Sequence, residues 1–385
     1  MRYIASSNPI NRNEASQMLE RFFVPEEDRV YVDQQQMRTA AEAIFRKMGQ
    51  TNDDAVLSAD VLMLSDLRGC ESHGVSNMLA SYVEQYGAGN INPRPNVRVI
   101  RESDTTATLD CDSGLGLHVA PKAMEMAIEK ADKHGMGTVV MNNGRHLGML
   151  AYHAMLPIKH DMIGVCMTAG NPMSMLPTFG AEKRFSTNPW AWAAPANKQP
   201  PFVMDFATTQ VAGNKLRLAA RVGAPMAPGW IAKPDGTPIM EETPLPENRD
   251  DYHMLPFGGT RDQGSHKGYG FAAVCEILCD VLSGQGAGFL MPQAPPGVMG
   301  HFVQVYKVDA FTDVERFKSD MDDFLEGLAN TKPAPGHDRV VYPGLPEAEE
   351  TEIRMRDGIP YHRSVIDWFH SISNELELGL ELPTV

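Results

Sequence analysis

The sequence has no long hydrophobic run and no apolar leader at its start. No segment approaches the ~18 consecutive apolar residues that a membrane-spanning helix needs. Residues 1–12 are polar and lack the apolar centre of a secretory signal peptide. We therefore expect a cytoplasmic protein that does not associate with membranes.

Cysteine is scarce, with five residues in a chain of 385. The number is odd, and Cys275 and Cys279 have helical i,i+4 spacing instead of the Cys-x-x-Cys spacing of zinc and redox sites. The sequence therefore predicts reduced and mostly buried thiols in a reducing compartment.

Basic residues are fewer than acidic ones, with 34 Lys and Arg against 49 Asp and Glu, so the formal net charge is −15. An acidic surface repels the phosphates of nucleic acids and anionic membranes. It still permits a small anionic substrate, because a local basic pocket can lie inside an acidic shell. We expect a small-molecule substrate and no nucleic-acid partner.

Several sequence motifs of common enzyme classes are also missing. Gly114-Leu115-Gly116 has no third glycine at the spacing of a Rossmann fingerprint, and no P-loop is present. No His-Glu-x-x-His motif or similar spacing suggests a metal site, so none is predicted. A serine hydrolase is excluded because no Gly-x-Ser-x-Gly elbow occurs, and because the side chains of the neighbours Ser72 and His73 should diverge.

The hydrophobic content of 43% allows two or three packed domains. Apolar spacing and cap residues predict α and β elements that alternate without a clean βαβ repeat. We expect an N-terminal extension at 1–30 with a short helix at 13–23, a helical domain at 31–95, a cofactor and substrate domain at 96–310, and a helical C-terminal region at 311–385. Expected helices cover residues 33–47, 52–67, 72–86, 117–134, 150–159, 209–220, 268–282 and 314–328, and expected strands lie within 97–109, 138–141, 163–168, 185–205 and 301–308. Asp33 is the expected N-cap of the first helix, Thr51 or Asn52 that of the second, and Gly135 follows the helix at 117–134.

The segment Ser72-His73-Gly74 is the first candidate for chemistry. At the start of a helix, the helix dipole would disfavour a charged imidazole and keep His73 ready to exchange a proton near pH 7. Gly74 would let a ligand approach closely. Taken alone, the pattern fits an N-cap serine before a surface histidine at least as well.

Three further segments stand out. His146 lies in the loop Asn142–Gly148, and Asp205 follows a short apolar strand, where it could orient an imidazole, bind a ribose hydroxyl or cap the next helix. Gly264–Gly270 is glycine-rich and contains Lys267, so it could hold a phosphate at a helix start. Each of these patterns is weak when taken alone.

Together, and in this order, five segments resemble the malate/L-lactate dehydrogenase-like family of NAD(P)-dependent oxidoreductases, which lacks the Rossmann fold. The segments are Asp66–Gly74, Gly144–His146, Thr187–Pro189, Asp205–Thr208 and His266–Gly270, and the resemblance spans about residues 33–345. It implies a mixed α/β fold with a largely antiparallel sheet plus a helical domain. It also implies a homodimer with its active site near the subunit interface.

The resemblance further implies reversible hydride transfer between NAD or NADP, with NAD slightly preferred, and a 2-hydroxy or 2-oxo acid. His73 would donate and accept the proton, and Ser72, His146 and Asp205 would complete the catalytic set. Cofactor contacts are expected at Gly170, Thr187, Asn188, Pro189, Met204, Asp205, Phe206, Ala207, His266, Lys267, Gly268 and Gly344.

One position departs from the family pattern. Several relatives carry an arginine four residues after the histidine, where it grips the substrate carboxylate, but this chain has Asn77. Arg68 or Arg145 could take over that contact. Three alternatives stay open: a cyclic-imine reductase, an inactive ligand-binding relative and a metal-dependent hydrolase.

Overall fold

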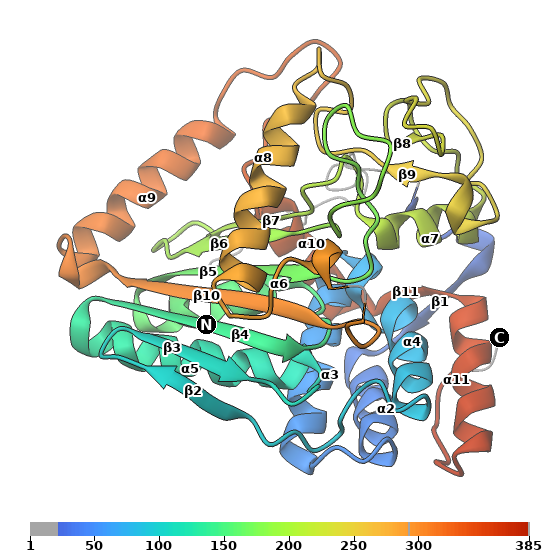
Figure 1. Ribbon diagram of the computed structural model, residues 1–385, viewed down its shortest axis with the longest axis horizontal. Helices are drawn as coiled ribbons and strands as arrows, with labels where there is room; N and C mark the ends of the chain where they lie inside the picture. Colours follow the sequence, from blue (N-terminus) through green and yellow to red (C-terminus); the bar gives the residue numbers. More distant parts are fainter. Residues whose placement is uncertain (1–21, 292, 384–385) are drawn as a thin grey trace.

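A seven-stranded sheet forms the centre of the computed structural model, which describes residues 22–291 and 293–383 (Figure 1). The strands lie in the order β2-β3-β4-β10-β5-β6-β7, and all neighbours are antiparallel except β3 and β4. Their bounds are β2 Arg98–Glu102, β3 Thr106–Asp110, β4 Met136–Gly144, β5 Met162–Gly170, β6 Trp190–Ala194, β7 Phe202–Phe206 and β10 Met299–Lys307. This confirms the predicted mixed α/β fold with a largely antiparallel sheet.

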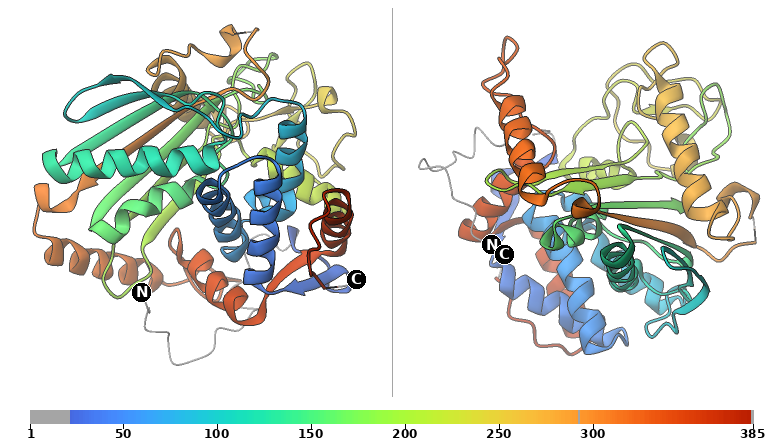
Figure 2. Two further views of the ribbon diagram at one scale, coloured as in Figure 1. Left: turned by 90° about the horizontal axis from the view of Figure 1, so that it is seen from below. Right: turned by 90° about the vertical axis from the view of Figure 1, so that its left-hand side faces the viewer.

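Helices cover both faces of this sheet (Figure 2). α5 (Gly116–His134) and α6 (Leu150–Met155) bury their apolar faces against one side. α8 (Ser265–Glu276), which continues as the π-helical turn Ile277–Val281, packs on the other side. Gly135 ends α5 with φ 86°, a left-handed conformation that glycine adopts without strain.

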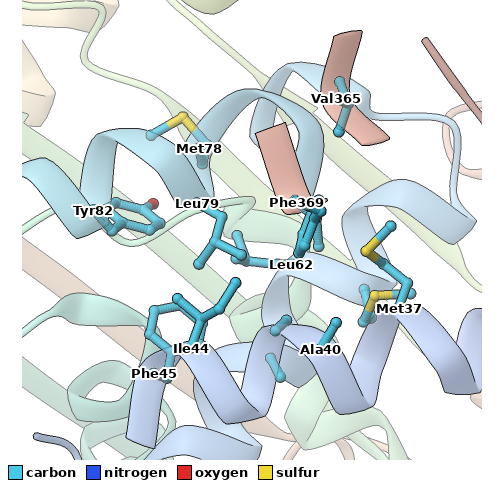
Figure 3. Packing of buried hydrophobic residues seen from close by; sticks show 14 of the residues in the cluster. Met37, Ala40, Ile44, Phe45, Leu62, Met78, Leu79, Tyr82, Val365 and Phe369 are labelled. Carbon is cyan, nitrogen blue, oxygen red and sulfur yellow. The ribbon is translucent and has the colours of Figure 1, made fainter. Parts of the chain in front are cut away.

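A helical block lies beside the sheet and consists of α2 (Gln34–Lys47), α3 (Asn52–Leu67), α4 (Val75–Gly87) and α11 (Arg363–Glu375). Asp33 and Thr51 cap α2 and α3 as the sequence predicted, because their side chains accept first-turn N–H groups. Figure 3 shows α2, α3, α4 and α11 meeting in one apolar core that includes Phe45, Leu62 and Phe369. The C-terminal region therefore packs with the helices near the start of the chain.

The C-terminal region contains a strand that the sequence did not predict. β11 (Ile359–His362) pairs antiparallel with β1 (Arg29–Val32), between α10 (Leu345–Asp357) and α11. A four-residue strand shows too little periodicity to be recognised, and its partner is distant in sequence. The predicted extension therefore overlaps β1, while residues 1–21, with most of the helix expected at 13–23, lie outside the described residues.

The remaining elements are α7 (Gly213–Val222), α9 (Val314–Ala329) and the short strands β8 (Ile231–Ala232) and β9 (His253–Met254). All five cysteines are free thiols and four of them are buried, as predicted. No helix among the described residues has both the length and the apolar character needed to cross a membrane. The domain boundaries stay a prediction.

Candidate active site

A cavity of about 1220 Å³ lies where the turn before α4 meets β7, α7 and the start of α10. Segments that are far apart in the sequence contribute to its wall. Nine of the predicted site residues line it, namely Arg68, Ser72, His73, His146, Thr187, Pro189, Asp205, Phe206 and Ala207. This cavity is the candidate active site.

His73 belongs to a 3-10 turn, Glu71–His73, and α4 begins only at Val75 after Gly74 as N-cap. The prediction of a helix that starts at Ser72 was therefore wrong. Burial and, to a smaller extent, the charge of Lys215 lower the pKa of His73 to about 4. His73 is neutral near pH 7 as predicted, but desolvation and a nearby cation are the cause instead of a helix dipole.

Ser72 and His73 contact each other, so the expectation that their side chains diverge was wrong. The Ser72 Oγ lies 2.9 Å from the Nδ1 of His73. The tight 3-10 turn allows two neighbouring side chains to fold towards each other, which an extended chain would prevent. This contact fixes the ring through Nδ1 and leaves Nε2 for a ligand in the cavity.

Gly74 makes room for a buried carboxylate of the protein itself, and not for a ligand as predicted. Asp66 Oδ2 accepts hydrogen bonds from the N–H of Val75 at 2.9 Å and from the hydroxyl of Tyr361 at 2.8 Å. A Cβ at position 74 would overlap Asp66 Oδ1. Burial raises the pKa of Asp66 to about 7. The carboxylate thus ties the start of α4 to β11.

Gly74→Ala is expected to lower the free energy of unfolding by about 1–3 kcal/mol, the usual cost of overpacking a rigid core. The reason is that Asp66 cannot move without losing its bonds to Val75 and Tyr361. Urea denaturation measures the change. Gly87→Ala is the control, since a Cβ at this other α4 glycine meets open space. Equal stability of the two variants would contradict the prediction.

Arg354, on α10, anchors the turn that carries His73, and no local sequence pattern predicts this role. Its guanidinium is 2.8 Å from Glu71 and 2.6 Å from Glu350, and it donates to the carbonyl oxygen of Asp66 at 2.8 Å. Arg354 is 3% exposed, so these bonds are shielded from water. Glu71 begins the turn that carries His73, and Arg354 therefore holds that turn in place.

His146 stacks beside His73, with ring centroids 5.7 Å apart and planes 11° from parallel. The backbone N–H of Gly148 donates to His146 Nδ1 at 3.2 Å, and the Tyr82 hydroxyl lies 2.6 Å from the same atom. Because a backbone N–H only donates, Nδ1 carries no proton and Nε2 does. Burial, followed by the charge of His73, lowers the pKa of His146 to about 3. The cavity therefore contains two neutral imidazoles side by side.

Asp205 makes a contact different from those the sequence suggested. Its Oδ2 accepts from the N–H of Ala151 at 2.7 Å, in the first turn of α6. It thus caps the helix that precedes it in the sequence instead of α7, which follows it. No hydrogen bond to an imidazole is found within the described part of the chain. Burial raises the pKa of Asp205 to about 6, and Arg68 opposes the rise.

The three residues that were predicted to bind the substrate differ in whether they reach the cavity. Arg68 lines the cavity, and its buried Nε has no hydrogen-bond partner among the described residues. Arg145 lies outside the lining and donates to Asn90 O, Gly144 O and Ser113 Oγ. Asn77 is buried and donates to Ser72 O at 3.0 Å. Of the three, only Arg68 is positioned to contact a ligand.

The predicted cofactor residues also divide into two groups. Thr187, Pro189, Asp205, Phe206 and Ala207 line the cavity. The others lie behind its wall or at the surface: Gly170, Asn188, Met204, His266, Lys267, Gly268 and Gly344. His266 and Lys267 are exposed at the start of α8. Gly268 and Gly344 instead allow close packing, because a Cβ would collide with Phe257 and Val203 respectively.

Two cations on α7 were not identified from the sequence as site residues. Lys215 and Arg217 both line the cavity. Nothing in the local pattern distinguishes them from the other 32 basic residues, because their importance depends on where α7 packs. Tyr82, the partner of His146, was missed for the same reason.

The hydrogen-bond donors and apolar surfaces of this cavity fit a nicotinamide dinucleotide. The cavity offers a buried guanidinium with an unpartnered Nε, at Arg68, which fits a phosphate or carboxylate. Its wall is otherwise of mixed polarity, with Phe206 and Pro189 as apolar surfaces for a flat ring. No group of three His, Cys, Asp or Glu side chains that could hold a metal ion occurs in residues 22–291 and 293–383.

The sequence is similar to those of known proteins over most of its length. The sequence profile of the family described as malate/L-lactate dehydrogenase matches residues 32–369. The malate dehydrogenase of Pyrococcus abyssi is 35% identical over 365 residues, which is 91% of this chain and 99% of that protein. The L-sulfolactate dehydrogenase of Methanocaldococcus jannaschii is 33% identical over 341 residues, covering 88% and 95% of the two chains.

The solved structures agree with the sequence relatives. The crystal structure of malate dehydrogenase from Entamoeba histolytica superimposes with a TM-score of 0.87 at 31% identity. The match covers 92% of this chain and 100% of that one. The structural similarity therefore extends over nearly the whole chain.

Proposed function

This chain belongs to the malate/L-lactate dehydrogenase family, and from that premise we propose that it oxidises a 2-hydroxy acid to the 2-oxo acid with NAD or NADP, and catalyses the reverse reaction. Membership makes it an oxidoreductase that acts on CH–OH groups. The observation that supports the finer proposal most strongly is the pair of neutral stacked imidazoles, His73 and His146, in one cavity with Arg68, whose Nε has no hydrogen-bond partner among the described residues.

His73 is the proposed proton donor and acceptor. In the tautomer in which its Nδ1–H donates to the Ser72 hydroxyl, the free Nε2 takes the proton of the substrate hydroxyl during oxidation and returns it during reduction. His146 presents its Nε2–H, because Nδ1 accepts from Gly148. That N–H donates to the substrate oxygen and stabilises negative charge that develops there.

The cofactor would be held by the wall around β7, where Thr187, Pro189, Phe206 and Ala207 line the cavity and Arg68 offers a charged donor. When bound, the nicotinamide supplies or accepts the hydride. Asp205 holds the end of β7 against the start of α6, because its carboxylate accepts the N–H of Ala151. His266 and Lys267 are exposed, so their predicted role is restricted to a part of the cofactor that extends beyond the cavity.

A substrate panel tests the proposed function. Purified protein is incubated with NAD or NADP and malate, lactate or sulfolactate, and absorbance at the nicotinamide band is followed; the reverse direction uses the 2-oxo acids and a cyclic imine carboxylate. Turnover of at least one hydroxy acid is expected. Turnover of the cyclic imine alone would replace the proposal by an imine reductase. Binding without any absorbance change would identify an inactive relative.

The pH dependence follows from the pKa of His73, which burial lowers to about 4. Oxidation needs the neutral ring as base, so its kcat/KM is expected to stay constant from about pH 8 to about pH 5 and to fall roughly tenfold per unit below the pKa. Reduction needs the protonated ring, so its rate should fall as pH rises. Stopped-flow assays in both directions measure this. An oxidation rate that falls near pH 6.5, the ordinary imidazole value, would contradict a buried neutral His73.

We also propose a homodimer in the cytoplasm. The outer face of α8 and the turn after it exposes Phe271, Val274, Ile277 and Val281, a contiguous apolar surface of the kind that subunit interfaces cover. The five free thiols suit a reducing compartment. Light scattering on purified protein measures the subunit number.

A further inference from the structure

Two cations on α7, Lys215 and Arg217, line the cavity without a counter-ion. Neither has a carboxylate within 4.0 Å among the described residues, whereas Arg354 at the same cavity binds two. Lys215 is half-buried and Arg217 is exposed, so both side chains can reach a ligand, and two like charges that line one cavity attract an anion. An anionic ligand is therefore expected at α7.

Both cations act on the imidazole pair. The charge of Lys215 lowers the pKa of His73, and the charge of Arg217 lowers that of His146. The packing agrees with this, because α7 contacts the turn Glu71–His73 and both cations line the same cavity as the two rings. An anion bound by α7 would thus lie next to the group that exchanges its proton with His73.

An aromatic residue that precedes the family match fixes the position of Lys215. The Lys215 Nζ lies 5.7 Å from the ring centroid of Phe22, which stacks on Trp230 at 5.9 Å and 13°. Phe22 is 8% exposed, so its ring is held rigidly, and a cation over a ring face is favoured. The match to the family begins only at residue 32, so this contact comes from the chain's own N-terminal segment.

The neighbouring part of α4 offers no cation to the same anion. Asn77 faces α7, with its amide 3.5 Å from Asn214 O, and its other bond goes to Ser72 O. Arg221, one turn beyond Arg217, donates to the backbone of Ser76. These contacts dock α7 directly on α4, beside the cavity that Lys215 and Arg217 line.

We propose that Lys215 and Arg217 bind the carboxylate of the substrate, and that Phe22 holds the Lys215 ammonium at that subsite. The inference rests on the proposed function, because it names the substrate group that the cavity takes next to His73. The ligand class is a small 2-hydroxy or 2-oxo acid, whose carboxylate is adjacent to the reacting carbon.

Oxalate is the probe, because it is a planar carboxylate similar in size to a 2-oxo acid and cannot be reduced. Calorimetric titration measures its affinity for the protein with NADH present, beside the KM for the best substrate. Lys215→Met and Arg217→Gln are each expected to weaken oxalate binding and raise KM by about 10- to 100-fold, the loss of one charge-assisted hydrogen bond. NADH affinity should stay unchanged.

Lys133→Met is the matched control, since it removes one exposed charge at the end of α5, away from the cavity. It should leave oxalate affinity and KM unchanged. Phe22→Leu keeps an apolar side chain but removes the ring face, and a loss of oxalate affinity of about 3- to 10-fold is expected from one cation–π contact. Lys215→Arg keeps the charge and should retain most of the binding.

Unchanged oxalate affinity in both Lys215→Met and Arg217→Gln would overturn the inference, and turnover by the wild type would still support the proposed function. If the wild type turns over no hydroxy acid but oxalate binding still depends on Lys215 and Arg217, the anion subsite stands and the proposed function fails. Circular dichroism verifies the fold of each variant. If Arg217→Gln does not fold, the contrast between Lys215→Met and Lys215→Arg decides.

Discussion

His73→Ala is expected to lower kcat by about 1000-fold, within the 10²–10⁴-fold range that one general acid or base contributes. The variant loses the imidazole that is proposed to act as the base. In the native protein this ring contacts Ser72, stacks on His146 and lines the cavity. The other imidazole, His146, already accepts from Gly148 at Nδ1, so its remaining nitrogen carries a proton and cannot act as the base. Steady-state assays in both directions measure the loss.

NADH binding should survive in His73→Ala, because the proposed cofactor residues lie around β7 and at Arg68 instead of on the 3-10 turn. Fluorescence titration with NADH tests this. His337→Ala, at an exposed histidine in the loop before α10, is the control and should keep full activity. Residual activity of His73→Ala near that of the wild type would remove His73 from the mechanism.

Arg354→Met is expected to lower the free energy of unfolding by about 3–5 kcal/mol, the cost of breaking a buried ion pair from one side. Methionine retains much of the side-chain length, so the effect comes from the lost charge. Glu71, which has 12% of its side chain exposed, and Glu350 would be left without their cation, and the carbonyl of Asp66 would lose its donor. Chemical denaturation measures the change.

The same variant should also lose activity, because Glu71 begins the turn that holds His73. Arg356→Met is the matched control on α10: its guanidinium is exposed and pairs only with the adjacent Asp357 among the described residues, so a change within about 0.5 kcal/mol is expected. If Arg354→Met were as stable and active as Arg356→Met, the anchoring role of Arg354 would be disproved.

The candidate site was predictable where several short motifs occur in a fixed order. Ser72, His73, His146 and Asp205 were chosen from such segments, and the structure brings all four to one cavity. The neutral state of His73 was also predicted, but from the wrong cause. A helix dipole can be guessed from local sequence, whereas desolvation and the charge of Lys215 depend on parts of the chain about 140 residues apart.

Errors arose where a residue has two possible partners. Gly74 was expected to admit a ligand, yet Asp66, eight residues earlier, fills that space. Asp205 was expected to orient an imidazole, bind a ribose hydroxyl or cap the next helix, and within the described residues its carboxylate instead caps the helix before it, while the ribose contact stays a prediction. Local patterns show that a glycine or carboxylate is needed but not what it meets, because the contact is formed by the packing of α3, α6 and β7.

Local sequence was enough to predict the element types and caps of α2, α3 and α5, the negative net charge, the free thiols and the family resemblance. These depend on composition and on periodicity within single segments. Three features became visible in the folded chain alone: Arg354 holds the His73 turn, β1 pairs with β11, and Lys215 and Arg217 line the same cavity as the imidazoles. Each of these contacts joins residues that are distant in the chain, and their geometry comes from the packing of whole helices and strands.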